Sequence, residues 1–329
     1  MNGKLEYRLF ESKVLQDNPL GDPVKREIIV YTPENYRNSN SKGYPTVFML
    51  PAFGNDSYSA LKHDPFSISI YDRLERLIQN RACGEIILVI VNCFNKFGGS
   101  QYINSVAVGR YEDYIVDEIV PFVDSNYNVS KRAVLGKSSG GYGALTLGMH
   151  HPDSFSAIAA HSFDSCFEYC YLPDFPIAFK TLKKYQGPKR WLNEFWSNEA
   201  NRIKDDFTTL NILSMAAHYS PNFNNQELYL DLPFDVHTGN FEENVWLRWK
   251  RHDPINLVST FEKGLKKMDL LYLDCGISDE FNLQIGTKVF SEKCKKLNIR
   301  HEYLEYNGGH FNTNHRFDIS LRKIYEALS

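Results

Sequence analysis

A serine with a glycine two positions before it and another two positions after it is the feature that most limits how this chain can fold. Residues 136–140 read Gly-Lys-Ser-Ser-Gly, which fits the pattern G-x-S-x-G. The apolar stretch 132–135 before it predicts a short buried strand, and the small-residue stretch 140–149 after it predicts a helix that packs closely on a sheet. A serine at such a sharp strand-to-helix turn has a strained backbone, which requires small neighbours. Ser138 is therefore a candidate nucleophile at the end of a sheet strand.

The tripeptide Gly136-Lys137-Ser138 also matches the end of a phosphate-binding P-loop. That loop requires a glycine five positions before its second glycine, and Lys131 stands there instead. A strand is also predicted where the flexible phosphate loop should be. The sequence therefore disfavours a nucleotide site.

Strands and helices are expected to alternate along most of the chain. Apolar runs bounded by polar turns predict strands at 26–31, 46–50, 85–91, 132–135, 155–160, 269–274 and 300–306. Helical spacing of apolar residues predicts helices at 71–82, 111–127, 281–297 and 319–328. We expect Pro121 to bend the second of these helices. The alternation predicts an α/β fold, with a mostly parallel sheet covered by helices on both faces.

Residues 165–255 interrupt this alternation. The segment is mixed polar and aromatic and contains all four tryptophans of the chain. Helical patterns occur at 178–184, 188–198 and 242–251. We interpret the segment as an insertion that caps a site at the carboxyl ends of the strands and supplies aromatic side chains to it. Each tryptophan taken alone is better explained as filling a small satellite core. No repeat or linker is visible, so residues 1–329 are expected to form one domain.

Composition excludes several classes of partner. The net charge of the 329 residues is −3 and no basic cluster occurs, so neither nucleic acid nor an anionic membrane is an expected partner. The first residues lack the apolar run of a signal peptide, and no stretch approaches the length of a membrane span, so we expect a cytoplasmic protein. A homo-oligomer is left open. The six cysteines are scattered and expected to stay reduced, and nothing completes a zinc site with Cys166 and Cys170.

A serine nucleophile needs a base to accept its proton and an acid to orient that base. In folds with this turn, the acid and then the histidine follow the serine along the chain. His310 is the expected base, because the strand that ends at Tyr306 is followed by two glycines that turn the chain into it. His315 is the rival and is expected on the surface or in a supporting position. His301 begins a strand, which places it at the wrong end.

The acid should lie in the loop after the predicted strand 269–274. Asp279 fits, because it follows Gly276 at the carboxyl end of that strand. Asp274, at the strand end and expected to be structural, and Glu280, expected to face solvent, are the alternatives.

Negative charge that develops on a substrate carbonyl needs backbone N–H donors. Ser139, directly after the nucleophile, should supply one of them. The loop 51–55 after the second predicted strand should supply the other, from Phe53 or, failing that, from Gly54.

Together these segments resemble the α/β-hydrolase fold and, within it, the esterase D family. Relatives in that family include S-formylglutathione hydrolases, enterochelin, feruloyl and acetylxylan esterases, and the antigen 85 mycolyltransferases. The resemblance covers nearly the whole chain, through residues 26–33, 44–54, 111–124 and 136–145. Asp279 and His310 match the family's acid and base, and Phe53 matches its oxyanion position. Lys137 and Ser139 depart from the usual His and Met of the serine turn, and Pro51-Ala52 departs from the usual His-Gly or Asp-Gly.

The resemblance implies hydrolysis of a small-molecule ester through an acyl-enzyme, without a cofactor or a metal ion. The expected activity is that of a serine carboxylesterase acting on short to medium acyl chains. Acyl transfer and thioester hydrolysis with the same three residues are alternatives, and a competing alcohol would separate transfer from hydrolysis. A non-catalytic binding module would lack one of the three residues, and none is missing here.

Overall fold

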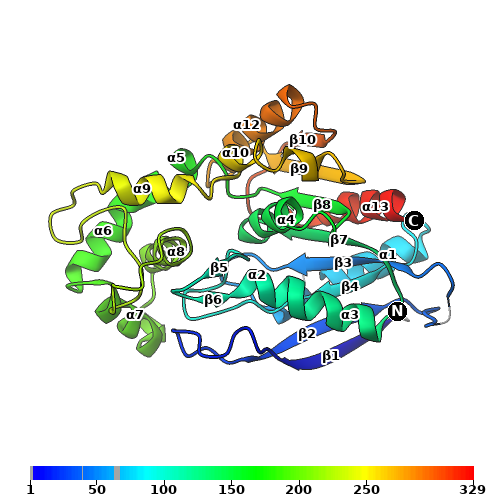
Figure 1. The fold of residues 1–329 in the computed structure, drawn as a ribbon, viewed down its shortest axis with the longest axis horizontal. Coiled ribbons are helices and arrows are strands. Elements are labelled where there is room, and N and C mark those ends of the chain that lie inside the picture. Colours follow the sequence, from blue (N-terminus) through cyan, green and yellow to red (C-terminus); the bar gives the residue numbers. More distant parts are fainter. Residues whose placement is uncertain (1–2, 39, 63–66) are drawn as a thin grey trace.

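An eight-stranded sheet forms the centre of the structure (Figure 1). The computed structural model describes residues 3–38, 40–62 and 67–329. In sheet order the strands are β1 (Lys4–Glu11), β2 (Lys25–Thr32), β4 (Ile87–Ile90), β3 (Tyr44–Leu50), β7 (Val129–Lys137), β8 (Ala157–His161), β9 (Leu270–Gly276) and β10 (Glu302–Tyr306). The β1–β2 and β2–β4 pairs are antiparallel, and the other neighbouring pairs are parallel. The mostly parallel sheet expected from the sequence is confirmed.

Every strand predicted from an apolar run is present, and β1 is the strand of the main sheet that was not predicted. Its side chains are exposed or only partly buried along its whole length, because it is the edge strand and pairs with β2 alone. An edge strand of this kind has no continuous apolar run that would identify it. A small ribbon of β5 (Asn104–Ser105) and β6 (Gly109–Arg110) lies apart from the main sheet.

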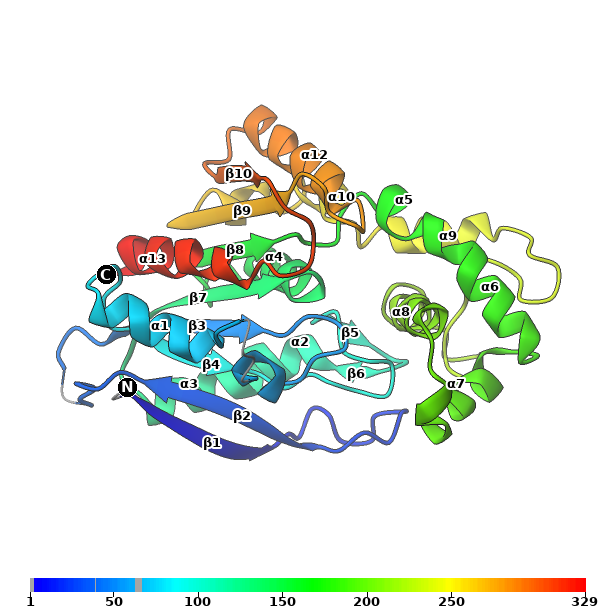
Figure 2. The same ribbon diagram turned by 180° about the vertical axis from the view of Figure 1, so that it is seen from behind.

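Helices cover both faces of the sheet, as Figures 1 and 2 show from opposite sides. Alternate side chains of β3 enter different cores: Val47 packs with the face covered by α1 (Ile70–Gln79) and α13 (Phe317–Leu328), and Phe48 packs with the other face. That other face carries α2 (Tyr111–Asp113), α3 (Val120–Asn126), α4 (Ser139–His150) and α12 (Leu283–Lys296). The short elements are η1 (Tyr58–Leu61), α10 (Pro254–Leu257), α11 (Glu262–Leu265) and η5 (Asn314–Arg316).

The helix predicted at 111–127 is continuous but irregular. A π-helical turn, η2 (Tyr114–Ile119), joins α2 to α3 directly before Pro121. Proline lacks an N–H group and its ring clashes with the preceding turn, so the regular α-helical pattern cannot run through it. Within the described residues, no helix combines the length and the apolar character needed to cross a bilayer.

The insertion at 165–255 lies beyond the carboxyl ends of the central strands, at the left of Figure 1. Its elements are α5 (Phe167–Cys170), η3 (Leu172–Asp174), α6 (Phe175–Lys184), α7 (Pro188–Ser197), η4 (Glu199–Asn201), α8 (Lys204–Tyr219) and α9 (Glu243–Lys250). The helices predicted at 178–184, 188–198 and 242–251 match α6, α7 and α9. The sequence missed α8, because nearly every residue from Thr209 to Tyr219 is buried and no polar face marks the helix.

The tryptophans fill a core, but that core is not a separate one. Trp191, Trp246 and Trp249 are buried in the same apolar cluster as the α4 face of the sheet, whereas Trp196 is 39% exposed. Tyr142 of α4 contacts the rings of Phe167 and Tyr219 and so connects the sheet to the insertion. The expected satellite core is therefore an extension of the main core. All six cysteines are free, as expected, and all six are buried.

Candidate active site

Ser138 occupies the strained turn that the sequence predicted. It lies between β7 and α4 with φ 58° and ψ −128°, a conformation that few residues other than glycine adopt. Its N–H donates a hydrogen bond to the carbonyl of His161 in β8, at 3.0 Å. A Cβ atom on Gly136 would lie 2.1 Å from the carbonyl oxygen of Gly140, and a Cβ on Gly140 would lie 2.1 Å from the carbonyl oxygen of Leu50. The glycines are therefore required for the chain to pass close to itself here.

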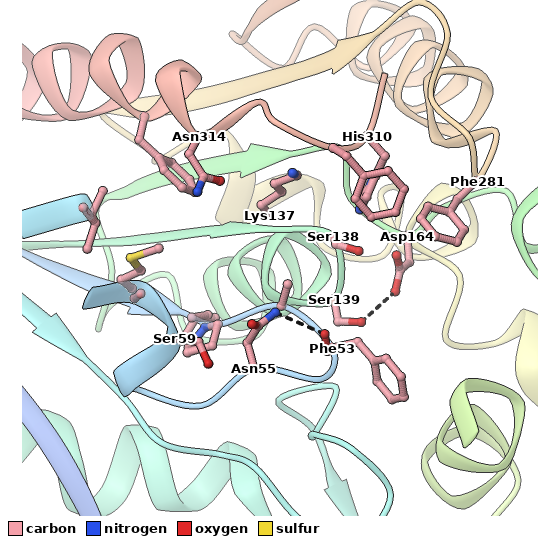
Figure 3. A pocket seen from close by; sticks show the side chains of 18 of the residues that line it. Phe53, Asn55, Ser59, Lys137, Ser138, Ser139, Asp164, Phe281, His310 and Asn314 are labelled. Carbon is pink, nitrogen blue, oxygen red and sulfur yellow. Dashed lines mark hydrogen bonds between the residues drawn. The ribbon is translucent and has the colours of Figure 1, made fainter. Parts of the chain in front are cut away.

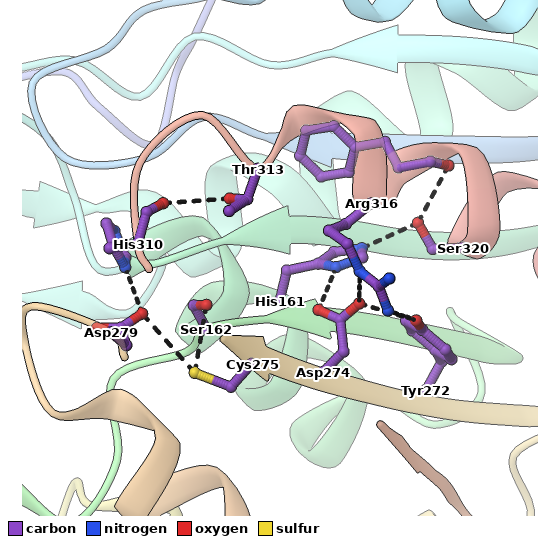
Figure 4. A network of polar contacts seen from close by, with 11 residues as sticks. His161, Ser162, Tyr272, Asp274, Cys275, Asp279, His310, Thr313, Arg316 and Ser320 are labelled. Atoms are coloured by element: carbon purple, nitrogen blue, oxygen red, sulfur yellow. Dashed lines mark hydrogen bonds and ion pairs between the residues drawn. The ribbon is translucent and has the colours of Figure 1, made fainter. Parts of the chain in front are cut away.

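The predicted acid and base lie side by side, from the loops after β9 and β10. The Nδ1 atom of His310 lies 2.8 Å from Oδ2 of Asp279, and both residues are buried (Figure 4). The other oxygen of Asp279 accepts the N–H of Phe281 at 3.0 Å. Burial raises the pKa of Asp279, but the hydrogen bond and the charge of His310 outweigh burial and leave that pKa below its usual value. This pair can hold one tautomer of His310.

The two rival histidines lie elsewhere. His315 is exposed on η5, and His301 directly precedes β10, where its Nε2 pairs with Ser291 at 2.8 Å. Neither residue lines the cavity that contains Ser138.

Glu280 has a contact that the sequence did not predict. The residue is exposed, as expected, but its carboxylate accepts the backbone N–H of His310 at 2.5 Å. A Cβ atom on Gly309 would lie 2.6 Å from the same carboxylate oxygen, so a larger residue there would displace the Glu280 side chain. The carbonyl of His310 accepts the hydroxyl of Thr313 at 3.1 Å. These contacts fix the loop that carries the imidazole.

Ser138 and His310 line one cavity of about 360 Å³ at the carboxyl ends of the strands. Figure 3 shows the serine hydroxyl and the imidazole on neighbouring walls. Among the residues that the structure describes, none forms a hydrogen bond with Ser138 Oγ within 3.5 Å. Hydrogen bonds between a nucleophile and its base are often long without substrate and tighten in the complex.

The two residues expected to supply backbone N–H donors line the same cavity. Ser139 is the first residue of α4, and Phe53 lies in the turn after β3. Within the described chain neither N–H has a hydrogen-bond acceptor, whereas the N–H of Gly54 donates to the carbonyl of Gly98 at 2.7 Å. Gly54 is therefore occupied, and Phe53 is the better donor of the two. The N-terminal end of α4 adds a positive partial charge at this point.

Asp274, the alternative acid, forms a second carboxylate–histidine pair. It is fully buried, lies 2.6 Å from Nδ1 of His161, and accepts hydrogen bonds from Tyr272 and Arg316 at 2.8 and 2.9 Å (Figure 4). Burial raises the pKa of Asp274, but the charges of His161 and Arg316 outweigh it and keep the pKa below its usual value. Neither Asp274 nor His161 lines the cavity. Their contacts tie the sheet to α13.

Asp164 lines the cavity and has no signature in the sequence. Its Oδ2 accepts hydrogen bonds from Tyr171 at 2.9 Å, Gln101 at 3.1 Å and the hydroxyl of Ser139 at 3.3 Å. Burial raises the pKa of Asp164. Gln101 and Ser139 are distant from Asp164 in the chain, so only the fold brings these two donors to it. The hydrogen bond between Asp164 and the Ser139 hydroxyl fixes the residue that follows the nucleophile.

The insertion supplies one aromatic side chain to the cavity. Cys170, Tyr171 and Asn211 are its contributions, and none of the four tryptophans lines the space. The other aromatic walls come from loops of the sheet, through Phe53, Phe281 and Phe311, and from Phe317 at the start of α13. The aromatic richness of the insertion is therefore largely structural.

Glu112, His150 and His151 form a group that could hold a metal ion. Oε1 of Glu112 lies 2.9 Å from Nδ1 of His150 and 2.8 Å from Nε2 of His151. Among the described residues, this is the group of three whose ligand atoms lie close enough together. None of its members lines the cavity.

Known structures share this architecture. A ferulic acid esterase superposes with a TM-score of 0.61 at 18% identity, covering 99% of each chain. The S-formylglutathione hydrolase of Agrobacterium tumefaciens gives 0.59 at 15% identity, covering 100% of this chain and 96% of that one. The fluorophosphonate-binding serine hydrolase F of Staphylococcus aureus gives 0.59 at 15% identity, covering 99% of both. These similarities establish the α/β-hydrolase fold.

The family assignment rests on the amino-acid sequence and not on these structural similarities. The family model described as "Putative esterase" matches residues 23–324, which include the serine turn and both loops that carry the acid–base pair. The chain therefore belongs to this esterase family, and it is a carboxylic ester hydrolase.

Proposed function

We propose that the chain is a serine carboxylesterase in which Ser138, His310 and Asp279 act as a catalytic triad. The observation that carries the proposal is the buried Asp279–His310 pair, 2.8 Å apart, facing a cavity that also contains the hydroxyl of Ser138. Asp279 holds the Nδ1 proton of His310, which leaves Nε2 available to accept a proton from the serine.

The reaction follows from this arrangement. Ser138 Oγ attacks the ester carbonyl while His310 accepts its proton. The imidazolium then donates that proton to the leaving alcohol, and an acyl-enzyme remains. Water, activated by the same imidazole, attacks the acyl carbonyl and releases the acid. Asp279 stabilises the imidazolium at both stages.

The oxyanion of each tetrahedral intermediate is bound by the N–H groups of Phe53 and Ser139. Both donors are unoccupied in the described chain, which supports their assignment. Donors placed in advance need no reorganisation as charge develops, and each one lowers the barrier by about 3 to 4 kcal/mol.

We assign residues 165–255 as a cap over this cavity. The assignment is supported by their place beyond the strand ends and by Tyr171 and Asn211 in the cavity wall. A cap controls how much water reaches the acyl-enzyme, so it also controls how readily an alcohol replaces water. Product analysis with a competing alcohol measures that ratio and separates hydrolysis from acyl transfer.

The test of the mechanism is a pre-steady-state burst with 4-nitrophenyl acetate. We expect 4-nitrophenol to be released in a burst equal to the enzyme concentration, and the acetyl group to appear on the peptide that contains Ser138. A linear time course combined with an unmodified Ser138 peptide in acid-quenched samples would contradict an acyl-enzyme that forms faster than it is hydrolysed.

A further inference from the structure

Lys137 places an amine in the catalytic cavity, directly before the nucleophile. It is the last residue of β7, and its side chain lines the same space as Ser138 and His310 (Figure 3). Asp279 and Glu280 attract the ammonium group, but in the described chain no carboxylate lies within 4.0 Å of Nζ and no hydrogen bond engages it. Burial lowers the pKa of Lys137 against that attraction. Lys137 is therefore partly buried, and its amine has no direct partner in the described chain.

Two other cations with little exposure are paired with carboxylates, and buried Arg26 is held instead by the carbonyl of Phe94 and the hydroxyl of Tyr111. The side chain of Arg73 is 7% exposed and lies 3.0 Å from Asp318, and that of Arg316 is 13% exposed and lies 2.9 Å from Asp274. A desolvated cation without a partner is costly, and a partner that arrives with a ligand removes that cost. The unpaired amine thus points to a negatively charged group in the substrate.

The cavity has two chemically different sides. In Figure 3, Lys137, Asn55, Ser59 and Asn314 lie on one side of Ser138, and Phe281 and Asp164 lie on the other. We call the first set the polar side. The side chain of Asn314, like that of Lys137, has no hydrogen-bond partner among the described residues. Two unengaged donors therefore face the same space.

Charge supports the same assignment. The lining residues of the cavity include two lysines, Lys62 and Lys137, and one acid, Asp164, which lies away from the polar side. Burial raises the pKa of Asp164, so its negative charge is disfavoured. Lys137 therefore supplies a positive charge to the polar side, which Asp279 and Glu280 offset only from beyond 4.0 Å.

We propose that the polar side of the cavity binds an anionic group of the substrate through Lys137 and Asn314, so that the preferred esters carry a carboxylate or a similar anion. The inference rests on the proposed function, because it concerns the substrate of the same site. The apolar remainder of such an ester would lie against Phe281 on the other side.

The experiment uses two matched pairs of esters. For an anion on the acyl part, 4-nitrophenyl hydrogen adipate is compared with its neutral methyl ester. For an anion on the alcohol part, 4-carboxyphenyl acetate is compared with its neutral methyl ester. We expect kcat/KM to favour the anionic member of one pair, by about 10- to 100-fold, which is the range for one charge-assisted hydrogen bond. The pair that shows the preference identifies the part of the substrate that carries the charge.

Variants then assign the preference to one amine. Lys137→Met keeps the length of the side chain without its charge and should abolish the preference, whereas Lys137→Arg should retain much of it. In Lys137→Met the anionic ester should lose more activity than its neutral partner, and the ratio of the two kcat/KM values is the readout. Lys131→Met is the matched control, since Lys131 lies on the same strand, half-exposed and paired with Asp269. That variant should keep the preference of the wild type.

Several outcomes would overturn the proposal. One is a wild-type enzyme without preference in either pair, and another is a Lys137→Met variant that loses anionic and neutral activity equally. Fluorophosphonate labelling of Ser138 separates these failures from a failure of the esterase mechanism itself. Adipate binding tests the anion site without catalysis. Adding adipate should raise the melting temperature of the wild type more than that of Lys137→Met. An equal rise in both proteins would refute the proposed site.

Discussion

The two carboxylate–histidine pairs allow the triad acid to be tested against an internal control. Asp279 and Asp274 lie five residues apart, and each contacts Nδ1 of a buried histidine. We predict that Asp279→Asn removes catalysis and leaves folding nearly intact, and that Asp274→Asn weakens folding and leaves the chemistry intact. The same chemical change at two neighbouring positions should therefore have opposite consequences.

The magnitudes follow from the contacts. At 2.8 Å and out of water, Asp279 both fixes the tautomer of His310 and stabilises the imidazolium, and losing both functions costs about 10³- to 10⁴-fold in kcat. That factor corresponds to about 4 to 5 kcal/mol of barrier. Asp274 balances Arg316 and His161, and removal of one partner from a buried pair costs about 3 to 5 kcal/mol of stability. For a chain of this length, the loss lowers the melting temperature by about 4 to 7 °C.

The assays are 4-nitrophenyl acetate hydrolysis at 20 °C and calorimetric unfolding of both variants. Asp274→Asn, assayed well below its melting temperature, should retain kcat within about threefold of wild type. The assignment of the acid would be wrong if Asp274→Asn lost activity while still folded, or if Asp279→Asn retained it.

Two further predictions concern the serine turn and the stability of the α4 end. Gly140→Ala should destabilise the protein by about 3 kcal/mol or more, measured by urea unfolding, because its Cβ would lie 2.1 Å from the carbonyl oxygen of Leu50; an unchanged midpoint would contradict the close approach. Burial raises the pKa of Glu112, but the hydrogen bonds and charges of His150 and His151 outweigh burial and lower that pKa to about 2. The ionised carboxylate therefore stabilises the folded protein above about pH 4.5, and this stabilisation is lost as the pH falls towards 2. The stability advantage of wild type over Glu112→Gln should therefore shrink by about 2 kcal/mol between pH 5 and pH 3, and a constant difference would refute the shift.

Features with a local cause could be predicted from the sequence. The serine turn was recognisable because strain at Ser138 requires small residues at fixed positions around it. The buried strands were recognisable because both of their faces are covered, which leaves continuous apolar runs. The loops that carry Asp279 and His310 follow such strands, so their order along the chain was enough to place both residues at the same end of the sheet.

Features that depend on tertiary contacts could not be predicted. β1 is an exposed edge without a continuous apolar run, and α8 is buried around most of its surface and lacks a polar face there. The contact between Glu280 and the N–H of His310 depends on how two loops meet. The unpaired amine of Lys137 and the hydrogen bonds of Asp164 emerge only when distant segments are brought together. The sequence showed that Lys137 stands at the second position of G-x-S-x-G in place of the usual His. It did not show what surrounds the Lys137 side chain.

The most direct test of the central claim is labelling by a fluorophosphonate, followed by mass spectrometry of the digested protein. Only a serine activated by a base reacts rapidly with such a reagent. We predict a single phosphonylated peptide that contains Ser138 in the wild type, no label in Ser138→Ala, and labelling slowed by several orders of magnitude in His310→Ala. Rapid labelling of wild type at another serine, or undiminished labelling of His310→Ala, would contradict the account.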